Sequence, residues 1–526
     1  RRSGWSRPPT AGSAPTFATS PVYRPRRPAE TPLYRVVQHH LNTFLARAEA
    51  DEIRPVSRWT EREFRQYLTC GILASGFARA RCGDCHQERL VAFSCKGRGV
   101  CPSCTNRRMA EVAAHLRDRV IPRVPVRQWV LSVPKRLRPA LARDPDLAGA
   151  VLRILLRVIQ RALRDTARAP LPAESRLGAV SFLHRFGSAL NPHPHFPLAV
   201  TDGLFAKDPD DALTFHPARR LDAANARSLT PVVQHRILRL YVRRGLLTRA
   251  EADDMLRWRG TGGFSLDGSV RVAAHDRAGL ERLLRYCARP PFALHRLRHV
   301  TQNRPLSSPD ARLVYHLPRP ARDGRTALRL APLELLDRLA RLIPPPRLHR
   351  HRYHGVFAPN AAWRKQVVRY GREDTEDTDA SDLAPVGGTD PCRHAPDRSP
   401  AALRARSRWA QLLARVYEID PLRCPTCHGE MRIVSFLTDP PVVRQILEHL
   451  DLPVRAPPLA PARGPPQHEL LSVVPPSPFD LPAAAPAERD PGDLSLRGGD
   501  GRWSAAEGRP LALSGGQPRA RPGRGG

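Results

Sequence analysis

The spacing of the cysteines constrains this chain more than any other feature of its sequence. Six of the ten cysteines lie between Cys70 and Cys104. Within this stretch, Cys82-x-x-Cys85 and Cys101-x-x-Cys104 are separated by fifteen residues. This spacing is typical of a four-cysteine zinc ribbon or knuckle, in which two tight turns each present two thiolates to one tetrahedral ion. We therefore predict a structural Zn²⁺ site in a reducing cytosol rather than a disulfide framework.

Three more cysteines leave the ligand set open. Cys95 lies between the two pairs and is a fifth candidate, so spacing alone does not decide which four of the five bind zinc; the two CxxC pairs are our choice. Cys424-Pro-Thr-Cys427 forms a second half-site whose partners the sequence does not identify. A purely structural role for this last pair is an equally good interpretation.

The chain is strongly basic, with a formal net charge of +35 and a pI near 11.2. Arginine and lysine neutralise phosphates and release counterions, so a polyanion is the expected partner. Near the cysteines we expect DNA contacts from Arg79, Arg81, Arg107 and Arg108. No stretch reaches the roughly 18 apolar residues of a membrane span, and the basic N-terminus has no apolar segment of a signal peptide. These features predict a cytoplasmic protein without membrane contact.

A chain of 526 residues is too long for one hydrophobic core and is expected to fold as several domains. Hydrophobic periodicity predicts helices and strands in a mixed α+β pattern. The helices are expected at 33–48, 61–73, 147–165, 230–245, 277–288 and 332–343, and the strands at 126–133, 178–184 and 196–200. Arg1 stands where a methionine would begin a chain, which suggests that the true start is missing.

Composition divides the chain into six parts. Pro-rich or Gly-rich ends without periodicity predict disordered tails, and a polar, acidic stretch predicts a linker. The expected parts are a tail at 1–30, a helical and zinc-binding domain at 31–118, an α+β domain at 119–370, a linker at 371–400, a small CxxC segment at 401–453 and a second tail at 454–526.

Two motifs in the α+β domain suggest phosphodiester chemistry. His193-Pro-His195 places two imidazoles on one face of an extended strand, within reach of one divalent ion. Tyr286 lies near the end of a helix that Asp276 caps and Pro290 stops, among Arg282, Arg285 and Arg289, which are candidate DNA contacts. A tyrosine there could attack a phosphodiester while arginines stabilise the developing charge. A half-buried helix tyrosine without catalytic role is the simpler alternative.

Several stretches, in one order along the chain, resemble the rolling-circle insertion-sequence transposases of the IS91 type. The similar segments are 67–77, 93–104, 127–132, 185–191, 280–291, 353–360 and 409–420. The resemblance implies a zinc-binding N-terminal domain followed by a nuclease domain of the HUH class, an antiparallel sheet flanked by helices. In that class, two histidines separated by one bulky apolar residue hold Mg²⁺ or Mn²⁺, and a helix tyrosine forms a 5′-phosphotyrosine with single-stranded DNA.

Carried over to this chain, the resemblance implies that Tyr286 is the nucleophile and that the substrates are single-stranded DNA at transposon ends and target DNA. Arg282 stands where many relatives have a second tyrosine, which indicates the single-tyrosine subgroup. Pro197 stands where the second HUH histidine is expected, so His193 and His195 would have to act as a shifted pair. Two alternatives stay open: a disabled copy that only binds DNA, and a replication initiator with the same chemistry.

Overall fold

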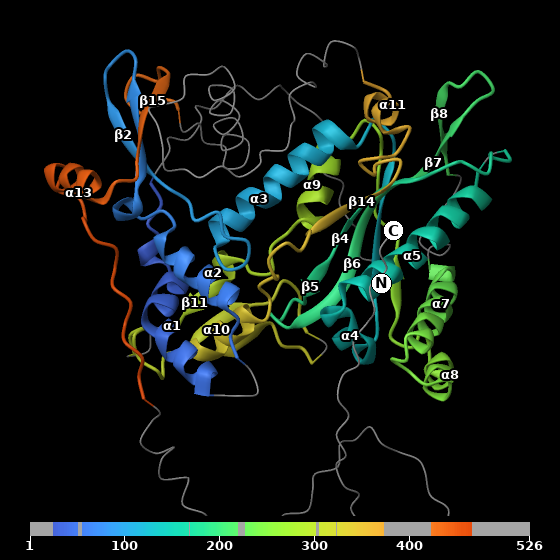
Figure 1. The fold of residues 1–526 in the computed structure, drawn as a ribbon, viewed down its shortest axis with the longest axis horizontal. Helices are drawn as coiled ribbons and strands as arrows, with labels where there is room; N and C mark the ends of the chain where they lie inside the picture. The colour runs from blue at the N-terminus through green and yellow to red at the C-terminus, as the bar shows by residue number, and fades with distance from the viewer. Residues whose placement is uncertain are drawn as a thin grey trace, which may run out of the picture. The chain divides into compact units, whose positions relative to one another are not determined.

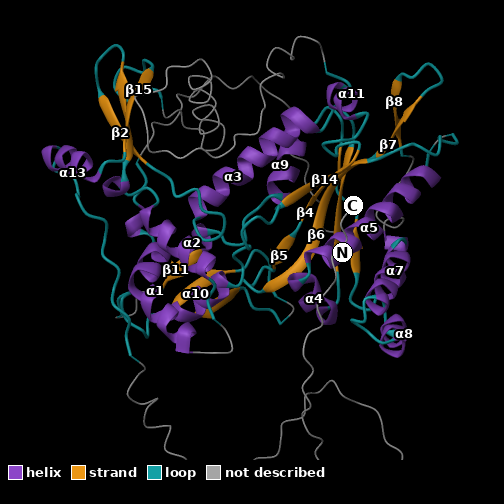
Figure 2. Cartoon of the chain, viewed as in Figure 1, coloured by secondary structure: helices purple, strands orange, loops and turns teal. Residues whose placement is uncertain are grey.

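The computed structural model describes residues 25–50, 55–167, 169–218, 227–300, 304–321, 323–372 and 422–464, and every statement on structure below concerns these residues. The segment 409–420 and the polar stretch from 373 to 400 lie outside them. The predicted mixed α+β class is confirmed: helices and several antiparallel sheets alternate along the described chain (Figures 1 and 2).

An antiparallel sheet of seven strands forms the centre of the region that contains the His-x-His motif and Tyr286. Its strand order is β10-β3-β6-β4-β14, with β5 also paired to β6 and β9 to β3. The strands are β3 (Val126–Ser132), β4 (Gly178–Phe182), β5 (His184–Phe186), β6 (Pro192–Thr201), β9 (Ser265–Asp267), β10 (Arg271–Val272) and β14 (His351–Gly355). The long strand β6 is central and begins before residue 196, where the sequence had predicted its start, so both histidines of the His-x-His motif lie on it.

Side-chain alternation along β6 separates two cores. Phe196, Leu198 and Val200 face a core shared with Leu155 and Ile237, because successive strand residues point to opposite faces. The helices on this side are α4 (Arg138–Arg143), α5 (Pro145–Asp165), α7 (Thr230–Arg243) and α8 (Arg249–Arg257).

The opposite face of the sheet is covered by a second group of helices. Ala199 of β6 packs there with Val180 of β4 and with Leu283 and Leu284 of a helix. The helices are α3 (Pro102–His115), its π-helical continuation (Leu116–Val120), α9 (Arg277–Cys287) and α11 (Arg364–Arg369). Since position 197 has the same parity as Ala199, the His193, His195 and Pro197 positions belong to the face toward α9.

A separate core joins the N-terminal helices to a later part of the chain. Helices α1 (Pro32–Ala50) and α2 (Arg58–Thr69) share buried contacts with α10 (Pro332–Ala340) and a small sheet. That sheet has the order β11-β12-β13, formed by Leu297–His299, Leu313–His316 and Ala327–Leu330. The predicted boundary near residue 118 is therefore not a boundary between cores, because residues of the expected nuclease region complete the core of the N-terminal helices.

The C-terminal part of the described chain returns to the N-terminal region. Strand β15 (Met431–Leu437) pairs with β1 (Phe77–Cys82), which pairs with β2 (Glu88–Ala92). Helix α13 (Pro440–His449) packs on Phe77. Beyond it, the chain runs along α1, where the Gln38 and Asn42 amides donate to carbonyls of Pro458 and Ala460. The sequence had placed this stretch in the C-terminal tail; the structure places it against α1.

The remaining elements are short. A hairpin of β7 (Gly203–Lys207) and β8 (Leu213–Pro217) follows the Asp202 turn after β6. The 3₁₀ turns are η1 (Pro28–Glu30), η2 (Leu73–Ser75), η4 (Lys135–Leu137) and η5 (Leu294–Arg296). The first of these lies in the stretch predicted as the N-terminal tail.

Candidate functional site

Eight of the nine described cysteines gather into two clusters of four. One consists of Cys70, Cys95, Cys101 and Cys104, and the other of Cys82, Cys85, Cys424 and Cys427. In each cluster the sulfur atoms lie within 4.8 Å of one another. The two CxxC pairs that spacing had grouped together therefore belong to different clusters, and each pair completes its set with cysteines from elsewhere.

The β1–β2 hairpin explains this separation. Cys82 ends β1 and Cys85 lies in the turn, so both are at the tip of the hairpin, whereas Cys70 and Cys95 are at its base. A six-residue strand spans about 20 Å, too far for thiolates at its two ends to share an ion. At the tip, Cys82 pairs in register with Met431 of β15, which brings the Cys424 pair alongside.

The cluster of Cys70 is held by its surroundings. Cys70 follows α2, and the positive φ of Gly71, 77°, allows the turn that redirects the chain there. The carboxylate of Glu63 accepts the backbone N–H groups of Arg98 and Gly99, both at 2.9 Å from Oε2. This contact fixes the loop that leads to Cys101. The cysteines of this cluster belong to the core around α1 and α2. A metal ion bound by them would therefore also stabilise the packing of that core.

Both clusters fit a tetrahedral zinc ion. A Zn–S bond of about 2.3 Å places sulfurs about 3.8 Å apart in a tetrahedron. The Sγ separations are 3.4 Å for Cys70–Cys101 and 3.7 Å for Cys70–Cys104 in one cluster. In the other cluster they are 3.4 Å for Cys82–Cys427 and 3.5 Å for Cys85–Cys424. All donors are cysteine sulfurs, which structural zinc sites bind as thiolates.

A pair of imidazoles lies at the junction of β5 and β6. His184 of β5 is opposite His195 of β6 in register, and its Nδ1 lies 3.2 Å from His195 Nε2. The other nitrogen of His184, Nε2, lies 2.6 Å from the backbone oxygen of Cys287, and His195 Nδ1 lies 2.9 Å from the backbone oxygen of His193. Burial lowers the pKa of His195 to about 4 and holds that of His184 well below its usual range. Burial thus favours the neutral form of both rings.

His193 takes a different position from the other two histidines. Its ring centroid lies 5.3 Å from that of His195, and its Nε2 is buried without a hydrogen-bond partner. In the described chain, no group of three His, Cys, Asp or Glu ligand atoms comes together here within 4.8 Å; only the two cysteine clusters meet that limit. The two histidines whose ring nitrogens lie within hydrogen-bonding distance are thus His184 and His195.

Tyr286 lies in the last turn of α9, next to this histidine pair. The helix begins at a cap in which Asp276 accepts the N–H of Gly279 at 2.7 Å, as expected from the sequence. Tyr286 is 50 % exposed, and the guanidinium carbon of Arg289 lies 4.7 Å from the centre of its ring. The residue after Tyr286, Cys287, provides the carbonyl that contacts His184. The tyrosine and the histidines are therefore connected through one backbone group.

A basic pocket of about 340 Å³ opens beside this pair. None of its lining residues is acidic. It is lined by Arg98, Arg108, Arg289, Arg347 and Arg350, by His184, His349 and His351, and by Met109, Val112, Phe182, Leu183, Phe186, Cys287, Ala288 and Leu348. Burial, with Arg98 and Arg108 nearby, lowers the pKa of Arg350 to about 10, so this arginine remains charged at neutral pH. Such a pocket fits a phosphate with an adjoining flat or apolar group.

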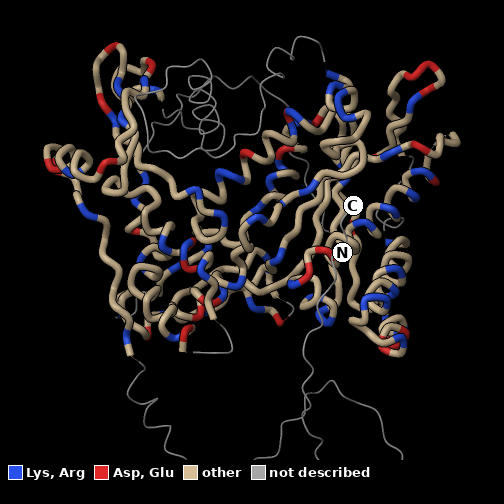
Figure 3. Tube along the Cα trace, viewed as in Figure 1, with Lys and Arg blue, Asp and Glu red and all other residues tan. Residues whose placement is uncertain are grey.

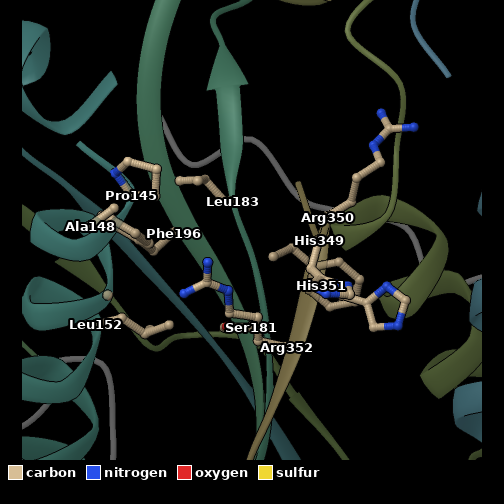
Figure 4. A pocket seen from close by; sticks show the side chains of 12 residues that line it. Pro145, Ala148, Leu152, Ser181, Leu183, Phe196, His349, Arg350, His351 and Arg352 are labelled. Carbon is tan, nitrogen blue, oxygen red and sulfur yellow. The ribbon is translucent and has the colours of Figure 1, made fainter. Parts of the chain in front are cut away.

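A second pocket lies between α5 and β14 (Figure 4). It measures about 20 Å³, which is room for about one water molecule. In Figure 4, Arg350 extends away from α5, whereas Ala148 and Leu152 of that helix line the other side. This pocket is too small for a nucleotide and we assign it no ligand.

The seven arginines predicted to contact DNA fall into three groups. Arg108 and Arg289 line the basic pocket. Arg79, Arg107 and Arg285 form ion pairs with Glu88, Glu111 and Glu281. Arg81 and Arg282 are exposed, and Arg282 also forms an ion pair with Asp276 at 3.9 Å. Lysine and arginine are spread over most described elements, with acidic residues between them (Figure 3), whereas the lining of the basic pocket includes no carboxylate.

Sequence reasoning missed several residues of these sites. Cys70 has no CxxC partner, and His184 is the last residue of a predicted strand without a histidine motif of its own. Arg347 and Arg350 were not singled out among 85 basic residues. A search for every histidine within a predicted strand, rather than for motifs alone, would have found His184. Cys70 lies in the predicted helix 61–73, where no such signal points to it.

Comparisons with known proteins agree with this arrangement. A family model described as a transposase zinc-binding domain matches residues 36–133, and one described as a putative transposase matches residues 178–365. The chain is 28 % identical over 138 residues to the transposase for insertion sequence element IS801 of Pseudomonas savastanoi pv. phaseolicola. The match covers 26 % of this chain and 32 % of that protein, so it spans about a third of the relative's length.

No solved structure matches the chain. Among the described helices, none is both long and apolar enough to cross a membrane. The zinc-binding domain model matches the range that holds the N-terminal cysteines, and the transposase model matches the later range that holds the tyrosine helix α9. The similar curated protein is also a transposase. The chain thus carries a transposase zinc-binding domain of the IS91 type followed by a putative transposase domain.

Proposed function

We propose that the chain transposes DNA by cleaving and rejoining single strands with Tyr286 as nucleophile. The observation that supports this most is the contact between the tyrosine helix and the histidine pair, in which His184 bonds to the carbonyl of Cys287, the neighbour of Tyr286. We expect a phosphodiester bound at His195 to come within reach of Tyr286. The expected substrates are single-stranded transposon ends and target DNA, in the cytoplasm.

The reaction that fits these groups is a transesterification. The Tyr286 oxygen forms a bond to phosphorus, the bond from phosphorus to the 3′ oxygen breaks, and the proton of the tyrosine ends on the departing 3′ hydroxyl. Mg²⁺ or Mn²⁺, held by His195 with a second imidazole, would polarise the phosphate oxygens. Arg289, which stacks on the ring of Tyr286, is placed to stabilise charge that develops on the phosphate.

The basic pocket supports single-stranded DNA as the substrate. Phe182 and Phe186 line it together with five arginines. Aromatic rings stack on unpaired bases, and guanidinium groups bind the backbone. A duplex keeps its bases paired and could not offer one to a pocket of this kind, so we expect single strands to bind more tightly than duplex DNA.

A covalent adduct provides the test. The purified chain is incubated with a labelled single strand from an element end and Mn²⁺, and the products are separated on a denaturing gel. We expect an adduct that the Tyr286→Phe variant does not form. Tyr370→Phe is the control, because the Tyr370 hydroxyl accepts the backbone N–H of Phe215 in the β7–β8 hairpin and its loss should leave the adduct unchanged. An adduct that persists in Tyr286→Phe would exclude this tyrosine.

A second candidate function is DNA binding without cleavage, which the position of Pro197 favours. Pro197 faces Val130 of β3 in register and can neither bind a metal nor donate a hydrogen bond. Under this proposal the natural chain binds single strands but forms no adduct, and the Pro197→His variant gains one. An adduct in the natural chain excludes it.

A further inference from the structure

We infer that His184 takes the place of the second histidine of the HUH motif, so that His184 and His195 together bind the divalent cation. This inference rests on the proposed function for the role of the cation, but not for its binding. The two residues of this site lie on neighbouring strands, whereas the two histidines of the HUH motif lie on one strand. The register of β5 on β6 sets His184 directly opposite His195.

The hydrogen bonds of the two rings fix where their protons are. The Cys287 oxygen, 2.6 Å from His184 Nε2, is an acceptor, so this nitrogen carries the hydrogen. The His193 oxygen, 2.9 Å from His195 Nδ1, assigns the hydrogen of His195 to Nδ1 in the same way. A neutral imidazole has one N–H and one lone pair. His184 Nδ1 and His195 Nε2 must then be the two nitrogens with lone pairs.

These two lone-pair nitrogens face each other at 3.2 Å. With the hydrogen of each ring on its carbonyl partner, neither nitrogen donates to the other, and a metal cation bound by both lone pairs would make the contact favourable. A metal–nitrogen bond of about 2.1 Å and this separation give an angle of about 100° at the metal. That angle lies between the values of an octahedral and a tetrahedral site. Carbonyl oxygens that accept the N–H of each ligating imidazole are also the usual surroundings of metal-bound histidines.

The other candidates for a second ligand fit less well. Pro197 has no donor atom. His193 has a buried free nitrogen, but the lone pair of His195 points to His184, because its other nitrogen is engaged by the His193 backbone. His193 therefore does not form the shifted pair with His195 that the sequence suggested, and we assign it no part in the two-nitrogen site.

Metal binding can be measured without DNA. The full chain, with zinc in its cysteine clusters, is titrated with Mn²⁺, and free Mn²⁺ is followed by electron paramagnetic resonance. We expect His184→Phe to weaken Mn²⁺ binding roughly 10-fold or more, since phenylalanine keeps the stacking on Phe186 without a ligand atom. His193→Ala should change the affinity by less than about 3-fold, which is under 1 kcal/mol. His354→Phe is the control for loss of a buried imidazole elsewhere in the sheet.

Two further measurements keep the test decisive if His184→Phe is less stable. Pulsed electron paramagnetic resonance on Mn²⁺ with ¹⁵N-histidine protein counts the bound imidazoles: we expect two in the natural chain and in His193→Ala. In the double variant His184→Phe with Pro197→His, the motif is restored on one strand and Mn²⁺ affinity should return. Loss of one imidazole in His193→Ala, or unchanged Mn²⁺ affinity in His184→Phe, would overturn the inference.

The outcome is separable from that of the proposed function. Mn²⁺ bound by two imidazoles, with no adduct at Tyr286, would uphold the His184 site and reject the tyrosine reaction. An adduct that needs His193 but not His184 would uphold the reaction and reject this site.

Discussion

The Sγ atoms of Cys82 and Cys427 lie 3.4 Å apart although 345 positions separate the two residues in the sequence. The contact completes a four-thiol cluster from two half-sites and fixes β15 as the third strand of the β1–β2 sheet. The first two predictions test this cluster and its neighbour.

Replacing Cys424 by serine should remove one zinc ion from the chain and leave the other. We expect two zinc ions per natural chain and one per Cys424→Ser chain, because a serine hydroxyl is a poor ligand for zinc. Zinc is measured by elemental mass spectrometry. Cys287→Ser is the matched control: Cys287 is buried but belongs to neither cluster, so two zinc ions should remain. Two zinc ions in Cys424→Ser would remove this residue from the ligand set.

Replacing Cys70 by serine should also remove one zinc ion, but at a larger cost in stability. Its cluster is embedded in the core of α1, α2 and α10, whereas Cys85 and Cys427 of the other cluster are exposed. We expect Cys70→Ser to lower the melting temperature more than Cys427→Ser does. Differential scanning calorimetry with zinc analysis on the same samples checks both effects. Equal melting temperatures would show that the buried cluster does not stabilise this core.

The Arg108→Gln variant should bind single-stranded DNA less tightly. Arg108 lines the basic pocket and its Nε is buried without a partner. Loss of one phosphate contact should reduce the slope of log affinity against log salt by about 0.7. Fluorescence anisotropy over a range of salt concentrations measures it. Arg107→Gln is the control, since Arg107 pairs with Glu111 and lies outside the pocket; an equal loss in both variants would argue for diffuse rather than pocket binding.

Protonation of His354 should account for part of the loss of folding stability in acid. Burial lowers the pKa of this residue to about 4, against about 6.5 in an unfolded chain. Because the folded pKa is lower, the neutral ring's contribution is complete above pH 6.5 and is lost as the pH falls toward 4. In His354→Gln the free energy of unfolding, from urea denaturation, should decline less over this range. His235→Gln, an exposed residue of α7, should leave the decline unchanged; a natural-like decline in His354→Gln would contradict the assignment.

Elements with strong periodicity were predictable from the sequence. Helix α5 was expected at 147–165 and spans Pro145–Asp165, and α9 was expected at 277–288 and spans Arg277–Cys287, because apolar residues recur at helical spacing and each begins at an aspartate cap. Helix α3 was missed, since arginine and alanine give its sequence little periodic contrast. The predicted helix at 61–73 ends earlier, at Thr69, where Gly71 turns the chain.

The sites were predictable only where their residues are neighbours in the sequence. Cys101 and Cys104 were identified by a local motif, but their partner Cys70 is brought to them by the return of a hairpin. His184 meets His195 through strand register, and the Cys424 pair meets Cys82 through the pairing of β15 with β1. Register between strands that are distant in the sequence depends on tertiary packing, so a single local motif does not reveal it.

The pairing of β15 with β1 also determines how long a chain under synthesis lacks its complete second cysteine cluster. A ribosome adds roughly 5 to 20 residues per second, so the 345 positions between Cys82 and Cys427 take roughly 20 to 70 seconds to make. For that interval a growing chain has Cys82 and Cys85 without their partners and β1 with one unpaired edge. Any product that stops before Cys424 stays in this state, with two free thiols and an open strand where the finished protein has a closed cluster.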